Sequence, residues 1–289
     1  MKKLFALILS AALMVSVSTV VSADRTKTYE AAKGTAVLDG KMDDAYKAAQ
    51  VISTTTTAEY VNESDQKNAP TAEVRFLWDD NYLYAYCEVK DSTPSTGYDS
   101  ENPYNSDSIE IFVDLKNTDT DKDVDLAYDD SAPTAGQFRA NTNNDNVTTG
   151  LHALFVWGRD NGKLKTITTK TDTGYISEFA IPFSDDFAKA AKEGKLIGIG
   201  FQVNDDVNND NTYEGVSLLS AEDGSAWQYI SGLGNLKLTG NTYVAEDTSD
   251  DNTDTETQNP TTGDSIYALI AICLISAGLL AFTVKRHKA

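Results

Sequence analysis

The fold class is decided by Asn102-Pro-Tyr-Asn-Ser-Asp-Ser-Ile-Glu-Ile-Phe-Val-Asp-Leu115. Its second half carries two alternating sets of side chains. One face of the predicted strand carries Ile109, Ile111 and Val113, and the open face carries Glu110, Phe112 and Asp114. A period of two is typical of a strand that lies half in a core, because successive side chains point to opposite faces. Tyr104 stands just before the strand, in a turn rich in Asn, Ser and Asp. The stretch therefore joins an aromatic ring at a loop edge to a carboxylate on an open strand face.

The chain from residue 24 to about 240 is dense in Val, Ile, Thr, Tyr and Phe, with turn residues between short runs. This composition is typical of many short strands, and the length suits one all-β domain. We predict an antiparallel β-sandwich of jelly-roll type over residues 24–240. A hairpin is expected from residues 72–78 and 82–90, which Asp79-Asp80-Asn81 joins.

Four further expectations concern the core of this domain. Trp78 shares a strand face with Val74 and Phe76, so it is expected in the core rather than at a ligand. Cys87 has no partner in the mature chain, which predicts a free buried thiol. The apolar run 151–157 is predicted to be a strand. One short helix is expected from an N-cap at Ser184 through residue 193.

The N-terminal residues have the three parts of a secretory signal peptide. Met1-Lys-Lys is basic, residues 4–21 are apolar, and Val21-Ser22-Ala23 offers small residues where a signal peptidase cuts. A membrane-spanning anchor is the alternative, but the polar Asp24-Arg-Thr-Lys follows directly. We therefore expect residues 1–23 to be removed and the protein to be secreted.

The C-terminal residues change character twice. Residues 241–258 consist almost wholly of Asn, Thr, Asp, Glu, Ser and Gln, which predicts an acidic disordered linker. Residues 259–289 then combine Asn259-Pro-Thr-Thr-Gly263, an uncharged apolar run over 266–284, and a basic tail. The apolar run is long enough to form a transmembrane helix, and the basic tail would stay on the cytoplasmic side.

This order of motif, span and tail resembles the cell-wall sorting signal of Gram-positive surface proteins, with Asn in place of the first Leu of Leu-Pro-x-Thr-Gly. The resemblance implies that a sortase cuts between Thr262 and Gly263 and links Thr262 to peptidoglycan. A plain C-terminal membrane anchor is the alternative. The sequence does not decide which sortase acts.

The chain is strongly acidic, with 24 Lys and Arg against 44 Asp and Glu and a formal net charge of −20. Removal of both ends takes away five basic residues and one acidic residue, so that 19 and 43 remain and the mature charge is −24. Such a surface repels phosphate backbones, which argues against nucleic acid as a partner, and it disfavours anionic polysaccharides. It attracts divalent cations.

The acidic loop 117–135 matches a calcium-binding EF-hand only in part. Its aspartates have the first three ligand spacings, but Val124 stands where Gly is needed and Asp130 where a bidentate Glu is needed. A solvated loop is the better interpretation, and calcium in another geometry stays open.

Polar and aromatic side chains gather on the predicted open strand faces and loops. They are Tyr104, Glu110, Arg139, Gln202, Asn204 and Trp227. Carboxylate, guanidinium and amide groups suit vicinal sugar hydroxyls, and aromatic faces pack on the C–H face of a pyranose. A plain cross-strand ion pair between Glu110 and Arg139, with Trp227 as a rim aromatic, explains the pattern without a ligand. The pattern alone slightly favours this second interpretation.

Six segments in order resemble carbohydrate-binding module family nine, a family of β-sandwich modules often attached to xylanases. They are residues 37–43, 72–84, 89–91, 102–114, 137–141 and 200–205. The resemblance covers nearly the whole folded domain, and it implies a non-catalytic module that recognises plant-type polysaccharide such as β-glucan or xylan. Together with the sorting signal, it predicts that this module is displayed on the cell surface.

The resemblance also assigns site residues. Two rings of the family hold the terminal sugar; Tyr104 matches the first, where the family has Trp, and Trp227 matches the second. Glu110, Arg139 and Gln202 match the polar residues that bind hydroxyls, and Asn204 on the same strand face completes our predicted set. The smaller ring at Tyr104 leaves the sugar and the affinity open.

The family carries structural calcium, and Asp39 and Asp91 stand in the matching turns, so both are predicted calcium ligands. Surface glycoside hydrolases are further expected partners.

Three other functions compete with this one. A glycoside hydrolase needs two carboxylates across a cleft, and Glu110 has only Asp114 on its strand face. A haem-binding relative needs axial ligands, for which the mature chain offers only Met42 and His152 and no Cys-x-x-Cys-His motif. A surface adhesin or scaffold domain without sugar binding is the third, and the Tyr for Trp exchange at 104 keeps it open.

Overall fold

A computed structural model describes residues 27–54, 56–57, 69–117, 126–213, 215–218 and 225–245. The described residues up to Val244 belong to one unit of the chain. Several predictions lie outside the described residues: the signal peptide 1–23, most of the linker 241–258, the attachment residues Thr262 and Gly263, the apolar run 266–284, and Asp119, Asp121, Asp123 and Asp125 of the loop 117–135. Among the described residues, no helix has the length and apolar character that crossing a membrane requires.

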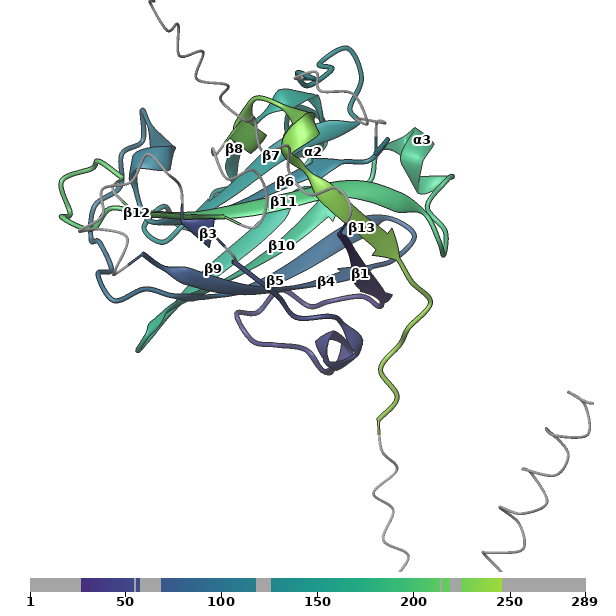
Figure 1. Cartoon of the computed structure of the whole chain (residues 1–289), viewed down its shortest axis with the longest axis horizontal. Helices are drawn as coiled ribbons and strands as arrows, with labels where there is room; N and C mark the ends of the chain where they lie inside the picture. The colour runs from purple at the N-terminus through teal and green to yellow at the C-terminus, as the bar shows by residue number, and fades with distance from the viewer. Residues whose placement is uncertain are drawn as a thin grey trace, which may run out of the picture. The chain divides into compact units, whose positions relative to one another are not determined.

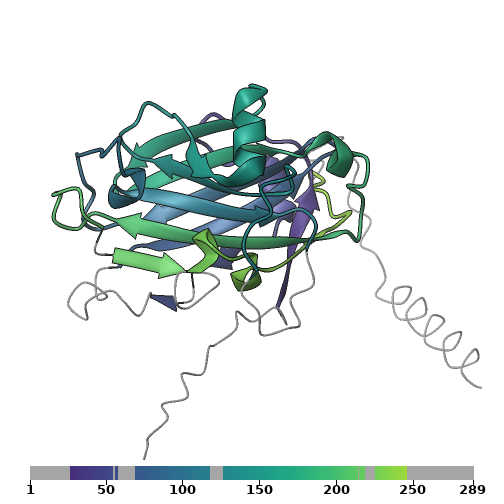
Figure 2. The same ribbon diagram turned by 90° about the horizontal axis from the view of Figure 1, so that it is seen from above.

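Two stacked β-sheets make up the described unit, and Figures 1 and 2 show them as two layers. Sheet A has the order β8-β7-β6-β11-β13-β1 and sheet B the order β1-β4-β5-β10-β9. Sheet A contains β6 (Ser108–Asp114), β7 (Ala135–Asn141), β8 (Thr149–Leu151), β11 (Leu196–Asp205) and β13 (Gly234–Leu238), and β12 (Gly215–Leu218) and β3 (Thr56–Thr57) extend it. Sheet B contains β4 (Thr71–Trp78), β5 (Tyr82–Lys90), β9 (Lys165–Thr171) and β10 (Gly174–Pro182), with β2 (Ile52–Ser53) paired to β4.

Strand β1 (Thr28–Lys33) joins the two sheets along one side. Its first four residues pair with β13, and Ala32 and Lys33 pair with Leu77 and Trp78 of β4. Both pairings are parallel, whereas the other paired strands of the described residues run antiparallel. The prediction of an all-β sandwich is thus confirmed in outline, as a sheet that curls over itself.

The core lies between the sheets and is built from the inward side of each alternating pattern. Ile109, Ile111 and Val113 of β6 are fully buried there, together with Phe76 and Trp78 of β4. The predicted hairpin is present as β4 and β5, in antiparallel register. Cys87 is a buried free thiol, as expected, and burial raises the pKa of this thiol well above its ordinary value.

The helical predictions need correction. Residues 151–157 are not a strand: β8 ends at Leu151, and α2 (His152–Asp160) follows. Leu154, Phe155 and Gly158 form the buried side of α2, the spacing of a helix that packs against a core. The expected helix from Ser184 to 193 is only α3 (Asp185–Ala188), and the Ser184 side chain makes no cap hydrogen bond.

The outer face of sheet B is covered by residues 34–50, which include the 3₁₀ segment η1 (Asp44–Ala48). Tyr46 is fully buried there against Leu77, Tyr84 and Tyr86. Beneath this segment Glu178 of β10 is also fully buried. Its Oε2 accepts hydrogen bonds from the amides of Gly40 (2.6 Å) and Asp39 (3.0 Å), but burial prevails and raises the pKa of Glu178 to about 7.

Candidate functional site

Three central strands of sheet A supply a polar patch on its outer face, which we call the polar floor. Glu110 of β6 pairs directly with Arg139 of β7 on one side and with Gln202 of β11 on the other. Residues that are directly opposite in an antiparallel pair share a face, so the three side chains lie in one row. Asn204 and Asn141 extend the patch on the same strands. The floor is therefore fixed by strand register rather than by loop conformation.

Glu110 is the centre of the hydrogen-bond network on the floor. Its Oε2 accepts from Gln137 Nε2 (2.6 Å), and its Oε1 accepts from Arg139 Nε and from Asn204 Nδ2 (3.0 Å). Gln202 Nε2 in turn donates to Asn204 Oδ1 (2.9 Å). Glu110 is 1% exposed and Arg139 6% exposed. The ion pair considered in the sequence analysis is present, and it forms part of a larger buried network.

Three oxygen atoms of the floor accept no hydrogen bond within the described part of the chain. They are Oε1 of Gln137, Oε1 of Gln202 and Oδ1 of Asn141, and each is buried. Buried polar atoms are nearly always paired, with protein, water or a ligand. Because carbonyl oxygens only accept, these three atoms are suited to a ligand that brings hydroxyl donors.

Tyr104 lies at one end of the floor, in the 3₁₀ segment η2 (Pro103–Asn105). Its side chain is 43% exposed, and the guanidinium carbon of Arg139 lies 5.9 Å from the centre of its ring. Tyr213 packs edge-to-face against the same ring at 6.0 Å. Asn141 Nδ2 donates to the carbonyl of Pro103 (2.7 Å) and ties η2 to the end of β7.

Trp227 lies at the other end, in the 3₁₀ segment η3 (Ser225–Trp227), and is 49% exposed. Its neighbour Ala226 packs with Ile230 against Phe112, which follows Glu110 by two residues on the same strand face. Phe112 was predicted to be on the open face of β6; it lies on that face but is 1% exposed, because this loop covers it. The loop thus brings Trp227 beside the polar floor.

All six predicted site residues therefore belong to one face of sheet A or to the loops that border it. Sequence reasoning missed Gln137, Asn141, Tyr213 and His152 as parts of this site. Gln137 and Asn141 have the same strand alternation as Arg139, so that signal was present. Tyr213 and His152 come from segments with no strand pattern that points to the floor, and only the fold shows their position.

Two glycines of β11, Gly198 and Gly200, lie on the outer face of sheet A, where a missing side chain is a sequence signal for room beside the backbone. At Gly198 the space is taken by the protein itself, because an added Cβ would lie 3.0 Å from Asp114 Cβ and 3.3 Å from Leu233 Cδ1. This glycine therefore serves the packing of Leu233 rather than a bound molecule.

A second cluster consists of three buried carboxylates at strand ends. Asp91 follows β5, Asp107 precedes β6 and Asp205 ends β11, and one oxygen from each lies within 4.8 Å of the others. Within the described residues neither Asp91 nor Asp107 makes an ion pair with Lys, Arg or His. Burial raises the pKa of Asp107 to about 6 although the amides of Asp206 and Ser95 donate to it.

This cluster fits a calcium ion. Calcium binds several carboxylate oxygens at about 2.4 Å, so one ion can bridge oxygens that lie within 4.8 Å of one another. Of the two predicted calcium ligands, Asp91 belongs to this cluster and Asp39 does not. The amide of Asp39 donates to Glu178, which pairs with Tyr86, four residues before the end of β5. Tyr86 is five residues from Asp91, so at a rise of about 3.3 Å per residue it is roughly 16 Å from Asp91.

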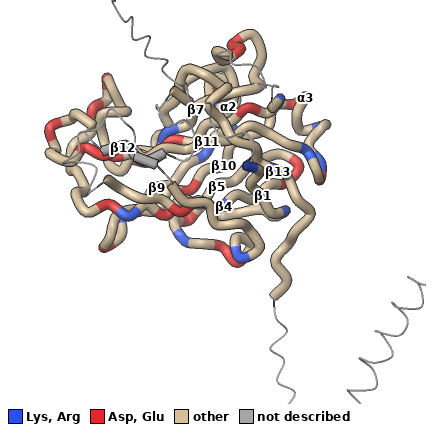
Figure 3. The backbone as a smooth tube through the Cα atoms, in the orientation of Figure 1, with Lys and Arg blue, Asp and Glu red and all other residues tan. Residues whose placement is uncertain are grey.

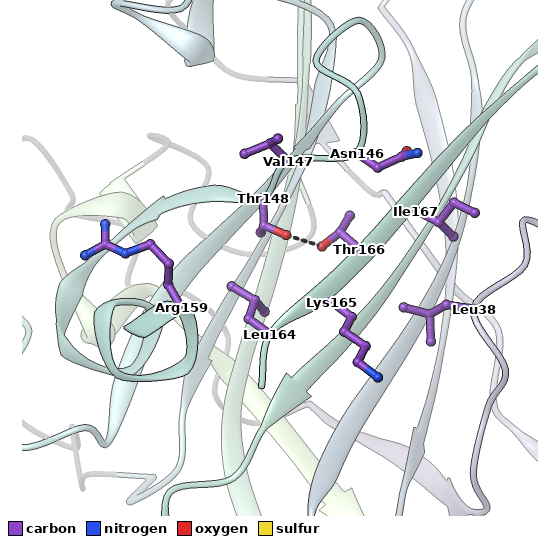
Figure 4. A pocket seen from close by; sticks show the side chains of 9 residues that line it. All are labelled: Leu38, Asn146, Val147, Thr148, Arg159, Leu164, Lys165, Thr166 and Ile167. Atoms are coloured by element: carbon purple, nitrogen blue, oxygen red, sulfur yellow. Dashed lines mark hydrogen bonds between the residues drawn. The ribbon is translucent and has the colours of Figure 1, made fainter. Parts of the chain in front are cut away.

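A separate groove lies between β9, α2 and residues 146–148, where the edges of the two sheets face each other (Figure 4). It has a volume of about 510 Å³, and Arg159 and Lys165 line it with mostly uncharged neighbours. The hydroxyls of Thr148 and Thr166 form a hydrogen bond across it. It contains none of the predicted site residues. Figure 3 shows the acidic residues of the described chain spread over several loops and strands rather than gathered at one site.

The model of the Carbohydrate family 9 binding domain-like family matches residues 38–241. The chain belongs to this family. The match confirms the predicted resemblance, and it includes every strand of the polar floor and both ring-bearing loops. The family 9 module accounts for the described domain from Leu38 onward.

Curated relatives of this family 9 module are much longer enzymes. Over 208 residues the chain is 38% identical to exoglucanase XynX of Acetivibrio thermocellus, which covers 72% of this chain and 17% of that protein. It is 37% identical to endo-1,4-beta-xylanase A of Thermoanaerobacterium saccharolyticum over 208 residues, which covers 72% of this chain and 16% of that protein. The chain thus spans about one sixth of the length of these relatives.

Solved structures share the fold. A carbohydrate-binding module of family 9 from Caldicellulosiruptor kristjanssonii, in complex with cellotriose, superposes with a TM-score of 0.58 at 24% identity and covers 81% of this chain and 100% of its own. The same protein in complex with glucose gives a TM-score of 0.59, also at 24% identity. At this identity the likeness shows the architecture alone.

Proposed function

We propose that this family 9 module is a non-catalytic, surface-displayed protein that binds β-glucan or xylan chains. The sugar stacks on Tyr104 and Trp227 and lays its hydroxyls on the polar floor. The observation that carries the proposal is the set of buried acceptors without a donor, on Gln137, Gln202 and Asn141, between two half-exposed rings. Sugar hydroxyls supply the missing donors, and ring C–H groups supply the apolar contact. The names of the relatives and the cellotriose and glucose complexes of the structural neighbour support this ligand class.

The test is calorimetry with cello-, xylo- and manno-oligosaccharides, each also in reduced-end form. We expect binding of at least one gluco- or xylo-series, and the reduced-end forms report whether the chain end is required. Trp227→Ala should remove most of the binding, because a half-exposed aromatic that packs on the ligand carries a large share of interface energy.

A matched control removes a tryptophan elsewhere. Trp157 lies on α2, packs against the core and has Lys163 Nζ 4.6 Å from its ring centre. Trp157→Ala should keep the sugar affinity of the folded protein, as judged by circular dichroism. Equal affinity of the Trp227→Ala variant and the wild type would contradict the proposed site.

Binding rather than hydrolysis is supported by the state of Glu110. Both of its oxygens already accept hydrogen bonds from protein groups, and Arg139 balances its charge. A hydrolase needs one carboxyl free to give up a proton and a second on the other side of the bond. Incubation with the oligosaccharides used for calorimetry should therefore release no shorter sugar.

Calcium is the proposed structural ion of the module, held by Asp91, Asp107 and Asp205. These residues come from the ends of strands in both sheets. An ion bound there would neutralise three buried carboxylates and join loops of both layers. It would act on stability, since none of the three belongs to the polar floor.

Surface display follows from the proposed sorting signal at Asn259-Pro-Thr-Thr-Gly263. Cleavage between Thr262 and Gly263 would leave the module attached to peptidoglycan by an acidic linker. Mass spectrometry of the protein released from cell walls should give a C-terminal peptide that ends at Thr262 and carries a peptidoglycan fragment. A peptide that continues beyond Gly263 would favour a plain membrane anchor.

A further inference from the structure

His152 adopts a backbone conformation that is unusual for its residue type and position. It is the first residue of α2 and has a φ of +72°. The other non-glycine residues with positive φ in the described chain are all Asn or Asp. A left-handed residue other than glycine costs on the order of 1 kcal/mol or more, and it persists where the surroundings fix it.

The surroundings of His152 fix its ring on three sides. The imidazole stacks on the ring of Tyr128, with centres 3.8 Å apart and planes inclined by 3°. Nδ1 lies 3.4 Å from Oδ1 of Asp130. Nε2 lies 3.0 Å from the carbonyl oxygen of Trp227. Because a carbonyl oxygen only accepts, Nε2 carries the proton in this hydrogen bond.

The stacked pair holds two consecutive carbonyls of the loop that carries the indole. The hydroxyl of Tyr128 donates to the carbonyl of Ala226 (2.6 Å), and His152 donates to that of Trp227. Farther along, the amide of Ile230 donates to the carbonyl of Leu126 (2.8 Å). The side chain of Trp227 is 49% exposed, so these backbone contacts are important restraints on the direction of its ring.

We infer that His152 is a positioning residue for sugar binding, which holds the Trp227 indole in its sugar-stacking orientation before the ligand arrives. This inference rests on the proposed function, because the orientation of the indole affects binding only if sugar stacks on it. The orientation itself does not depend on a ligand. A ring that is fixed in advance loses less conformational entropy on binding. The left-handed backbone at His152 is the local cost of directing the imidazole to the Trp227 carbonyl.

The test uses two substitutions that fit a positive φ. His152→Asn suits the backbone but is too short to reach the Trp227 carbonyl, and His152→Gly removes the side chain and the backbone strain together. Both should weaken oligosaccharide binding roughly 3- to 10-fold, the size expected for one lost hydrogen bond. In a Trp227→Ala background, titrated by NMR at high sugar concentration, the same substitutions should change the residual affinity less than twofold, because their effect passes through the ring.

A readout without sugar separates this inference from the proposed function. The protein is labelled with fluorotryptophan, and the ¹⁹F resonance of residue 227 is assigned with Trp227→Phe. Both His152 variants should shift or broaden that resonance, while those of Trp78 and Trp157 stay in place. Asn146→Gly, a substitution at another left-handed residue (φ +62°), is the matched control: Asn146 lines the separate groove and accepts from the amide of Thr168, and its loss should leave both the resonance and the affinity unchanged.

The possible outcomes are distinct. An unchanged residue 227 resonance in both variants overturns the inference, and so does a shifted resonance with unchanged affinity in a protein that binds sugar. A shifted resonance in a protein that binds none of the sugars supports the positioning of the ring and counts against the proposed function alone.

Discussion

Two glutamates on opposite outer faces of the sandwich are both buried, but the groups that surround their carboxylates differ. Glu110 on sheet A accepts hydrogen bonds from a guanidinium and two amide side chains. Glu178 on sheet B accepts only from two backbone amides among the described residues, and its pKa rises to about 7. One carboxylate has a cationic partner, whereas burial shifts the other toward its protonated form by raising its pKa.

The difference follows from what covers each face. Over Glu178 the chain places Tyr46 and the apolar side of residues 34–50, which leave no room for a ligand. Over Glu110 it places rings at the two ends and leaves acceptors between them. The cluster of Asp91, Asp107 and Asp205 is a third arrangement, in which three buried carboxylates lie together. A counter-charge and a raised pKa thus offset the cost of desolvation at the two glutamates, and the metal ion proposed above would do so at the aspartate cluster.

The largest expected effect comes from breaking the counter-charged pair. Glu110→Ala should lower the free energy of unfolding by about 3–5 kcal/mol, because it leaves the guanidinium of Arg139 buried without a partner. Denaturant unfolding monitored by fluorescence measures this loss, and sugar binding should disappear with it. Glu110→Gln keeps the shape and one acceptor, so it should cost less. A loss below about 1 kcal/mol for Glu110→Ala would mean that the pair behaves as an exposed ion pair.

The next effect concerns calcium. Adding calcium to chelator-treated protein should stabilise it by about 3–4 kcal/mol when the ion is present at 100 to 1,000 times its dissociation constant. Asp107→Asn should abolish most of this gain, because it removes a charge from the centre of the proposed site.

Glu178→Gln serves as the control for the calcium measurement, since it changes a buried carboxyl of the same domain that lies outside the cluster. It should keep the full calcium gain. A thermal transition that does not respond to calcium in the wild type would remove the metal ion from the comparison and leave protonation as the remaining answer for the cluster.

The third effect depends on pH. The folded-state pKa of Glu178 is raised to about 7, above the ordinary value near 4.3 expected in the unfolded chain. Its contribution to stability is therefore fully present below about pH 4 and is lost as the pH rises through 7. Between pH 5 and 8 at saturating calcium, the wild type should lose on the order of 2 to 3 kcal/mol relative to Glu178→Gln, whose amide oxygen keeps the bonds to Gly40 and Asp39. Parallel stability curves for the two proteins would contradict the raised pKa of Glu178.

The sequence allowed much of this arrangement to be predicted where strand periodicity carries the information. The alternation around Glu110 placed its side chain opposite the core, and the same rule applied to Arg139 and Gln202. Strand periodicity gave a wrong prediction at α2, because the apolar run from Leu151 has no clear period. The helix begins at His152, whose left-handed backbone is set by tertiary contacts. Strand periodicity also failed at Asp107 and Asp205, which meet Asp91 only when the ends of strands distant in the sequence come together.

The smallest expected effect concerns the end of the polar floor where Tyr104 lies. Tyr104 is 43% exposed, touches Tyr213 edge-to-face and lies over Arg139, so its outer face is available for stacking. Tyr104→Trp should enlarge that face and tighten oligosaccharide binding by about 2- to 5-fold, or 0.5–1 kcal/mol, with little change in stability. Tyr104→Phe is the control: it loses only the hydroxyl, which donates to Asn102 Oδ1 at 3.2 Å, and should bind within about twofold of the wild type. If Tyr104→Trp binds more weakly while Tyr104→Phe binds normally, Tyr213 already completes the stacking surface and the chain has tuned this end of the floor to a smaller ring.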